Sequence, residues 1–266
     1  LIAIVPISFS VSPFMVFTDG MLAWPPDPEA WSLRWYKNMI GDCSADVVSS
    51  TVPCSTKWMT GTVNSFFIGI VSTVIATALG TLAALGLSRP HMPYKGIIMA
   101  ILISPMIVPL IITAAGMFFF YARINLVYTF TGVILAHVAL ATPFVVITVT
   151  ATLVGFDMNM VKAAQSLGAK PARTFFKVIM PLILPGIISG ALFAFITSFD
   201  EVVIVMFMAS LDQLTIPKQM WAGIRQEISP VILCMATCLV ALSIFLLTTV
   251  ELLRRRSEKL RGISQR

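Results

Sequence analysis

Long uncharged apolar runs alternate with short polar segments along this chain. Six such runs cover approximately residues 1–17, 62–88, 96–121, 126–155, 182–209 and 229–250. A helix needs about 20 residues to cross the hydrocarbon core; five runs have that length, and residues preceding Leu1 would complete the first. Backbone amides inside lipid must be bonded internally, and no run alternates polar and apolar positions as barrel strands do. We therefore predict an all-α integral membrane protein with about six transmembrane helices.

The composition supports a single transmembrane domain over residues 1–266. Hydrophobic residues make up 58% of the chain and charged residues 11%, and the mean hydropathy of +0.92 excludes an ordinary soluble domain. The net charge of +6 does not gather on a basic helix or an aromatic–basic surface, so we expect no nucleic-acid partner. The four Cys form no CxxC pair, no His lies near them at ligand spacing, and no GxxxxGK phosphate loop is present. We expect no metal, no cofactor and no enzymatic activity in this chain.

The distribution of basic residues predicts the orientation of the helices. Twelve of the 18 Lys and Arg residues fall in the turn after Ser88, in the loop 156–181 and in the tail 251–266. Lys and Arg accumulate on the cytoplasmic side of membrane proteins, so we assign these segments to the cytoplasm. With six spans, both termini are then cytoplasmic, and the protein is a multi-pass component of a bacterial inner membrane surrounded by lipid.

The longest outer segment, residues 18–61, is predicted to be a periplasmic loop. It contains a short amphipathic helix over 29–39, whose aromatic residues are expected to anchor at the headgroup level, with direct substrate contact as the alternative. Cys43 and Cys54 lie in the same loop and are predicted either to form a disulfide or to remain two thiols. Cys234 and Cys238, four residues apart in the sixth run, are interpreted as packing residues.

The loop 156–181 between the fourth and fifth runs carries the most specific pattern. Asp157 is a candidate helix N-cap, and Ala163, Ala164 and Leu167 form the apolar stripe of one short helix. Gly168 can adopt the left-handed conformation that ends such a helix. Pro171 then suits the first turn of a second short helix over 172–179, which includes Phe175. The pattern predicts a compact knob that a groove on a partner protein could hold.

The same residues resemble the EAA loop of binding-protein-dependent ABC importer permeases. The resemblance rests on Lys162-Ala163-Ala164, then Gly168, then Val178-Ile179-Met180-Pro181, with Lys162 where the family usually has Glu. It implies a coupling helix that docks on an ATP-hydrolysing subunit through Lys162, Ala163, Ala164, Leu167, Gly168 and Phe175. It also implies three kinds of partner: a second homologous permease subunit, two ATP-binding subunits and a periplasmic solute-binding protein.

Further motifs are similar to the spermidine/putrescine permease branch of that family. They are SLRWY from Ser32, NSF from Asn64, LGTLAALGLSR from Leu79, SFDEVVIVMF from Ser198 and PKQMW from Pro217. The segment around Cys43 and Cys54 is longer than that branch usually shows. This resemblance implies a polyamine or a related small amine as cargo, and opines, aminophosphonates and other small solutes stay open.

Asp200 and Glu201 interrupt the fifth run in its outer half. An ionised group inside hydrocarbon costs roughly 2.5–3.5 kcal/mol on insertion scales, so such residues usually face a partner or a water-filled path. We predict that at least one of them contributes to a site for a cationic substrate. A structural contact with the second permease, or a place at the outer membrane edge, is the alternative. His137, in the fourth run, is interpreted as a buried hydrogen-bonding residue and not as a proton relay.

Two other classes of protein would also be polytopic. An ion-coupled secondary transporter could use Asp200 or Glu201 as its ion site, but it would not need the knob in the loop 156–181. A membrane scaffold would explain the knob as a docking site alone. Pro105, Pro109 and Pro143 are expected to kink the third and fourth helices.

Overall fold

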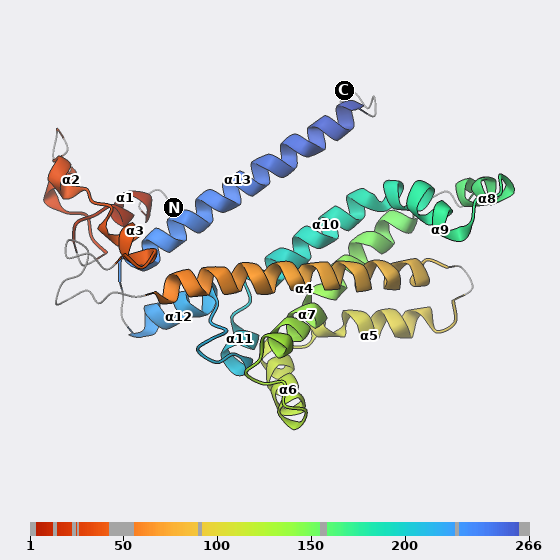
Figure 1. Cartoon of the computed structure of the whole chain (residues 1–266), viewed down its shortest axis with the longest axis horizontal. Helices are drawn as coiled ribbons and strands as arrows, with labels where there is room; N and C mark the ends of the chain where they lie inside the picture. The colour runs from red at the N-terminus through yellow and green to blue at the C-terminus, as the bar shows by residue number, and fades with distance from the viewer. Residues whose placement is uncertain are drawn as a thin grey trace. The chain divides into compact units, whose positions relative to one another are not determined.

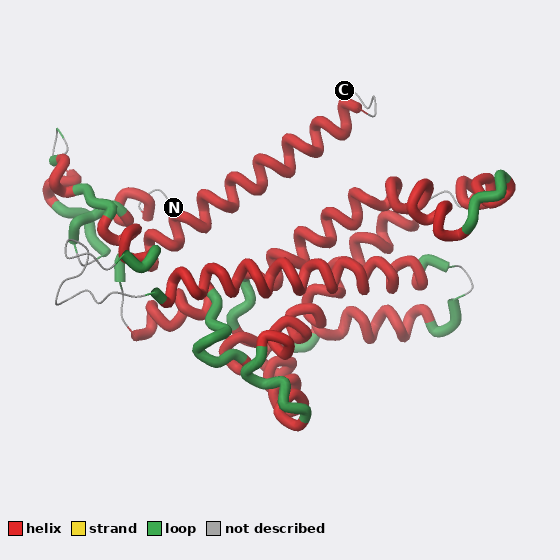
Figure 2. Tube along the Cα trace, viewed as in Figure 1, coloured by secondary structure: helices red, strands yellow, loops and turns green. Residues whose placement is uncertain are grey.

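The computed structural model describes residues 4–12, 15–22, 25, 27–42, 56–89, 92–154, 159–226 and 229–260. The regular structure of these residues is helical, and the bridge between Ser10 and Trp31 is their one β pairing (Figures 1 and 2). The chain forms two compact units, Leu1–Met59 with Gln219–Arg266, and Thr60–Lys218. The prediction of an all-α protein is confirmed.

The unit Thr60–Lys218, called the central unit after its place in the sequence, is made of long apolar helices joined by short connections. Its elements are α4 (Lys57–Leu87), α5 (Lys95–Ile107), α6 (Leu110–Arg123), α7 (Phe130–Val154), α8 (Asn159–Ser166), α9 (Pro171–Thr174), the π-helical turn η2 (Phe175–Ile179), α10 (Met180–Phe199), α11 (Val203–Met208) and the start of α12 (Ile216–Gln226). Three helices are long and apolar enough to cross a membrane: α4, α7 and the continuous helix Pro171–Phe199. They match the second, fourth and fifth runs of the sequence.

The third run does not form one straight helix. It is divided into α5 and α6, which are bent by 103° where Val108 and Pro109 connect them. Steric conflict with the proline ring disfavours the helical conformation for the preceding residue, and Val108 is extended, with ψ of 135°. The predicted kink at Pro109 is therefore a complete break. Pro105, by contrast, lies inside α5.

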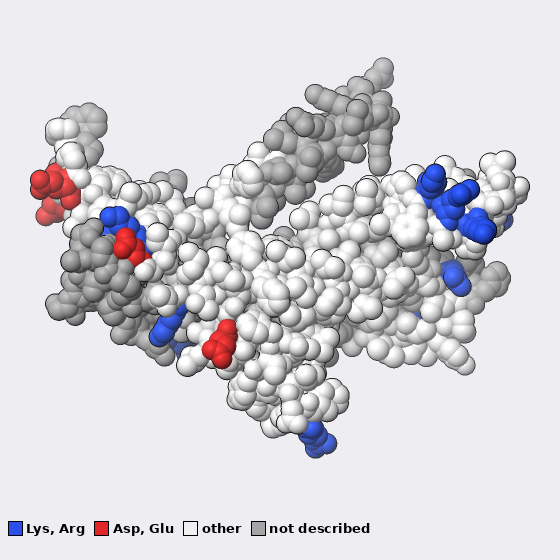
Figure 3. Space-filling view, viewed as in Figure 1, with Lys and Arg blue, Asp and Glu red and all other residues white. Residues whose placement is uncertain are grey.

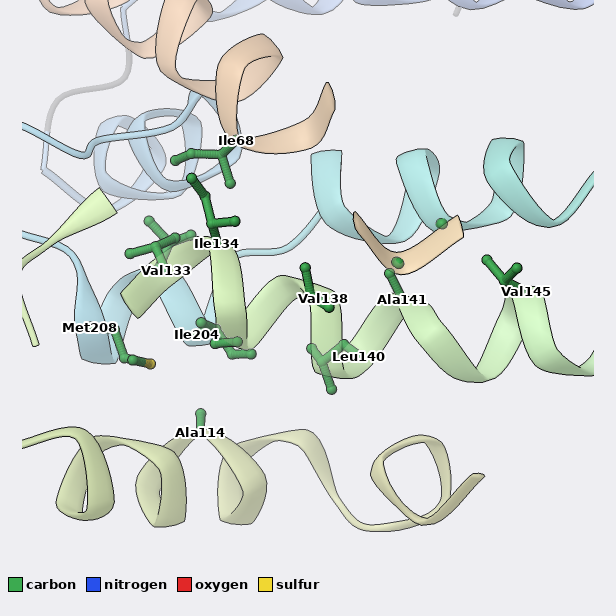
Figure 4. Close-up of a cluster of buried hydrophobic side chains, with 14 of the residues drawn as sticks. Ile68, Ala114, Val133, Ile134, Val138, Leu140, Ala141, Val145, Ile204 and Met208 are labelled. Atoms are coloured by element: carbon green, nitrogen blue, oxygen red, sulfur yellow. The ribbon is translucent and has the colours of Figure 1, made fainter. Parts of the chain in front are cut away.

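The core of this unit lies around α7. Its apolar side chains are buried on several sides, and Figure 4 shows Ile68 of α4 and Ala114 of α6 flanking it. Glycines allow α10 to approach α7 closely: a Cβ on Gly190 would lie 3.0 Å from Val145 Cα, and one on Gly186 would lie 2.9 Å from Thr152 Cβ. Small residues at such crossings let membrane helices make extensive van der Waals contact.

Two predictions about the fifth run need correction. The expected short helix over 172–179 is the beginning of the helix that continues through α10, because the η2 turn joins them without a break. At the other end, α10 stops at Phe199, and α11 starts at Val203 as a separate helix. The expected span through residue 209 is thus interrupted where Asp200 and Glu201 occur.

The other unit contains α1 (Ile4–Ser8), α2 (Asp19–Leu22), the 3₁₀ turn η1 (Pro28–Ala30), α3 (Arg34–Met39) and α13 (Val231–Leu260). Within the described residues the first run forms only the five-residue helix α1, so the predicted span over 1–17 is not formed there. The predicted helix over 29–39 is divided into η1 and α3. The sixth run lies in α13, where Val231–Phe245 is apolar but shorter than a full span.

Side chains from α3 and α13 donate hydrogen bonds to the backbone at the end of α1 and just after it. Trp35 is 1% exposed, and its indole Nε1 donates to the carbonyl oxygen of Ser10 at 2.7 Å. The buried thiol of Cys234 donates to the Ser8 carbonyl oxygen at 3.3 Å, which is consistent with the packing role predicted for it. Cys43 and Cys54 lie outside the described residues, as does Asp157.

Candidate functional site

The two acidic residues predicted for the substrate path have different environments. Asp200 ends α10 and is exposed, whereas Glu201 is 7% exposed. The Glu201 Oε1 accepts the backbone N–H of Ile204 at 2.8 Å, in the first turn of α11. A buried carboxylate that caps a helix start in this way satisfies an otherwise unbonded amide. Glu201 therefore has a structural partner within its own chain, and Asp200 is the carboxylate open to a ligand.

Lys218 binds the opposite end of α11. Its Nζ donates to the carbonyl oxygens of Val205 and Ala209, both at 3.2 Å. A cation at a helix C-terminus interacts favourably with the unbonded carbonyls there. Burial lowers the pKa of the Lys218 ammonium below its ordinary value.

The start of α4 fixes the loop that follows α11. The Asn64 side-chain amide donates to the carbonyl oxygens of Asp212 and Leu214, at 2.7 and 3.0 Å. Ser65 Oγ accepts the N–H of Ile216 at 2.8 Å. The loop after α11 is thus held by side chains far away in the sequence, and both of these, Asn64 and Ser65, belong to the NSF pattern.

Three phenylalanines pack together near the end of α10, which Asp200 follows. Phe199 lies with its ring centroid 5.3 Å from that of Phe66 and 5.5 Å from that of Phe195. All three side chains are partly buried. Aromatic rings and carboxylates are the two kinds of group that bind an alkylammonium ion best. Local sequence does not reveal this cluster, since its members come from two helices, α4 and α10.

His137 is buried beside the same part of α10. It is 1% exposed, and its Nδ1 lies 2.8 Å from Ser198 Oγ. This confirms the predicted hydrogen-bonding role. Among the described residues, no group of three or more His, Cys, Asp or Glu side chains could hold a metal ion.

The knob in the loop 156–181 has the predicted turn. Gly168 adopts a left-handed conformation with φ of 78°, and the N–H of Ala169 donates to the Ala164 carbonyl oxygen at 3.0 Å. Pro171 then occupies the first turn of α9, as expected. Glycine adopts this left-handed conformation after α8 with little conformational energy, whereas most other residues would be strained there.

The knob exposes most of the residues predicted to couple to a partner. Lys162, Ala163 and Gly168 are exposed, Leu167 is 89% exposed, and Ala164 is partly buried. An almost fully exposed leucine at the end of a short helix is a typical anchor for a partner's apolar pocket. Phe175 differs, because it is partly buried and lines a groove, and Phe176 beside it is 65% exposed.

Basic side chains gather around this end of the central unit. Figure 3 shows Lys and Arg over the region of α8 and α9, with no acidic side chain among them on the visible face. The sequence explains this distribution, since Asp157 is the one acidic residue between residues 47 and 199. The surface is complementary to an anionic partner.

Comparison with known proteins identifies the family. Residues 76–259 match the family described as binding-protein-dependent transport system inner membrane component. The spermidine/putrescine transport system permease protein PotC of Haemophilus influenzae is 29% identical over 195 residues, covering 73% of this chain and 76% of the relative. The putrescine permease protein PotI of Escherichia coli K12 is 29% identical over 215 residues, 78% of this chain and 72% of PotI.

Two further matches extend the comparison. The trehalose transport system permease protein SugB of Mycobacterium tuberculosis is also 29% identical, over 203 residues, 76% of this chain and 68% of SugB. The crystal structure of a bacterial ABC transporter involved in the import of the acidic polysaccharide alginate contains a chain of the same fold. Its TM-score is 0.70 at 14% identity, covering 94% of this chain and 88% of that one. With a family match over more than half of its length, and with helices apolar enough to span a membrane several times, this chain belongs to the inner-membrane permease components of binding-protein-dependent ABC importers.

Proposed function

We propose that this permease forms part of the path by which a polyamine, such as spermidine or putrescine, enters the cell. The names of PotC and PotI support this cargo, but the trehalose permease is equally identical, so identity alone does not select it. The observation that carries the proposal is the placement of Asp200. It is an exposed carboxylate directly after Phe199, whose ring packs on those of Phe66 and Phe195, in a unit with very few acidic residues.

The two acidic residues are assigned separate roles. Asp200 contacts an ammonium group of the substrate, and the aromatic rings offer their faces to the same charge. Glu201 positions Asp200 by capping α11, and it is not assigned a substrate contact. A neutral sugar would gain no charge–charge attraction from Asp200.

Coupling to ATP hydrolysis is assigned to α8 and to the helix that follows. Lys162, Ala163, Ala164, Leu167 and Gly168 would dock on a separate ATP-binding subunit. The continuous helix Pro171–Phe199 supports this role, since it connects the knob directly to the position of Asp200. Close packing of Gly186 and Gly190 against α7 would make the two helices move as one body.

The assembly implied by this function has four kinds of component. A second homologous permease would complete the path, two ATP-binding subunits would bind the knobs, and a periplasmic binding protein would deliver the cargo. The basic loop 156–181 and the tail 251–266 would lie in the cytoplasm, with both termini on that side. Transport would then proceed by alternating access of the path to either side.

A different small solute is the second candidate. The match to the trehalose permease favours it, and opines or aminophosphonates are further members of this class. The exposed knob argues against an ion-coupled secondary transporter, because such a transporter has no ATP-binding subunit for the knob to bind.

The test replaces Asp200 by Asn in the complete importer and measures uptake of labelled spermidine into proteoliposomes. Interactions with a charged group contribute roughly 1.5–3 kcal/mol, so uptake efficiency is expected to fall roughly ten-fold or more. Asp212→Asn is the matched control, since Asp212 is another exposed acidic residue of the same unit. Equal spermidine uptake by the Asp200→Asn variant and the native protein would contradict the role of Asp200.

A further inference from the structure

An apolar groove of about 500 Å³ lies between α4 and the helix formed by η2 and α10. Its lining residues are Thr73, Val74, Thr77, Ala78, Thr81, Leu82, Phe175, Met180, Ile187 and Ala191. The wall is almost entirely carbon, and the Thr73 hydroxyl donates to the Gly69 carbonyl oxygen in its own helix at 2.6 Å. The volume falls within the range of about 300–1,000 Å³ typical of sites for small ligands. Its chemistry selects an apolar occupant.

The groove is open to the surrounding medium along an apolar surface. Val74 is 63% exposed and Leu82 is 65% exposed, so two of the lining side chains also form its rim. Both belong to α4, a helix apolar enough to cross the membrane. An apolar groove that is open at the side of such a helix can take up a lipid acyl chain from the bilayer.

A cluster of basic residues lies in the chain segment that forms one end of the groove. Lys170, Arg173 and Lys177 are exposed and follow one another at intervals of three and four residues. Lys177 lies in the chain between Phe175 and Met180, both of which line the groove. No Asp or Glu occurs between residues 158 and 199 to neutralise the three charges. The chain segment at this end of the groove thus carries three basic residues and no acidic one.

We propose that the groove and this cluster bind one anionic phospholipid. An acyl chain would occupy the groove, and the phosphate would lie against Lys170, Arg173 and Lys177. Basic residues at the membrane boundary attract anionic headgroups, and long Lys and Arg side chains reach the headgroup level while their stems cover apolar surface. Since Phe175 and Lys177 belong to η2, the lipid would sit at the joint between the knob and α10.

The experiment uses the complete importer in nanodiscs that contain a photoactivatable phosphatidylglycerol or the matching phosphatidylcholine, each with the reactive group on an acyl chain. Cross-linked peptides are identified by mass spectrometry. We expect labelling of the α4 and α10 peptides that line the groove, several-fold stronger with phosphatidylglycerol. Loss of one basic residue that contacts an anionic headgroup lowers the affinity for that lipid roughly five-fold. The triple variant Lys170→Gln, Arg173→Gln, Lys177→Gln should therefore lose the preference for phosphatidylglycerol.

Three control variants separate the contributions. The charge-conserving triple variant Lys170→Arg, Arg173→Lys, Lys177→Arg should keep the preference for phosphatidylglycerol. Arg123→Gln, in the last turn of α6, should leave it unchanged. Ala78→Trp fills the groove and should reduce labelling by both lipids, whereas Ile97→Trp, on the exposed surface of α5, should not.

Two outcomes would overturn the proposal. One is equal labelling of the groove by phosphatidylglycerol and phosphatidylcholine in the native protein, or a preference that survives the neutral triple variant. The other is absence of lipid labelling together with cross-links from groove residues to the second permease, which would show that a protein subunit covers the groove. Thermal unfolding of each purified complex verifies that the variants are folded.

Discussion

The Glu201 carboxylate and the Lys218 ammonium bind opposite ends of the same short helix, α11. Glu201 accepts the N–H of Ile204 at 2.8 Å, and Lys218 donates to the carbonyl oxygens of Val205 and Ala209 at 3.2 Å. A helix this short leaves most of its terminal backbone groups without partners inside the helix. The two charged side chains supply these partners, so they stabilise the break that places Asp200 at the end of α10.

The capping role of Glu201 predicts a difference between two substitutions. Glu201→Gln keeps an oxygen that can accept the Ile204 N–H, whereas Glu201→Ala leaves this buried amide without its partner. Such a loss costs roughly 1–3 kcal/mol. We expect Glu201→Ala to lower the thermal unfolding temperature of the purified complex clearly more than Glu201→Gln does. Asp200→Ala, at an exposed side chain, is the control and should have little effect; a larger loss there would contradict the assigned roles.

The left-handed conformation of Gly168 predicts a defect in coupling. No atom would contact a Cβ at this position, so the effect of substitution comes from the backbone alone, with φ of 78°. A non-glycine residue pays roughly 1–2 kcal/mol for this conformation. We expect Gly168→Val to weaken stimulation of ATP hydrolysis by the loaded binding protein while the membrane helices stay folded.

Gly168→Asn is the matched variant, because Asn tolerates the left-handed region better than Val does. It should retain more of the stimulation. Equal stimulation in all three proteins would show that the geometry of the knob is not needed for coupling.

The close approach of α7 and α10 predicts intolerance to small additions at Gly190. A methyl group there would lie 3.0 Å from Val145 Cα, and such overpacking costs typically about 1–3 kcal/mol. We expect Gly190→Ala to lower the unfolding temperature of the complex. Gly116→Ala serves as the control, since Gly116 lies in α6 with no atom within 4 Å of an added Cβ. The account is wrong if Gly116→Ala is the more destabilising change.

The loop after α11 is predicted to depend on Asn64. Asn64→Ala removes the donor to the Asp212 and Leu214 carbonyl oxygens, whereas Asn64→Gln keeps an amide on a longer side chain. We expect faster amide hydrogen exchange over residues 209–215 in the Ala variant, with little change in α7. Unchanged exchange in this loop would indicate that Ser65 and the backbone hold it without Asn64.

The parts of the fold that depend on local pattern could be predicted from the sequence. Uninterrupted apolar runs predicted α4, α7 and α10, because hydropathy decides which segments lipid can surround. Gly168 and Pro171 marked the turn and the next helix start, since each restricts or extends the backbone locally.

Features that depend on distant contacts could not be predicted. Nothing in the local sequence shows that Glu201 caps α11, that Lys218 binds its other end, or that Trp35 bonds to Ser10. The break between α5 and α6 had a signal in Pro109, but a proline can either kink or end a helix, and the surrounding packing decides. The groove that contains Phe175 combines helices from separate runs.

The most direct test of the central claim is uptake of labelled spermidine and putrescine into proteoliposomes that hold the complete importer, with ATP inside and the loaded binding protein outside. The account predicts uptake that requires ATP and does not follow an imposed ion gradient. Transport driven by an ion gradient without ATP would contradict the importer mechanism. Failure to take up either amine, while a binding protein loaded with another solute still stimulates ATP hydrolysis, would contradict the polyamine assignment.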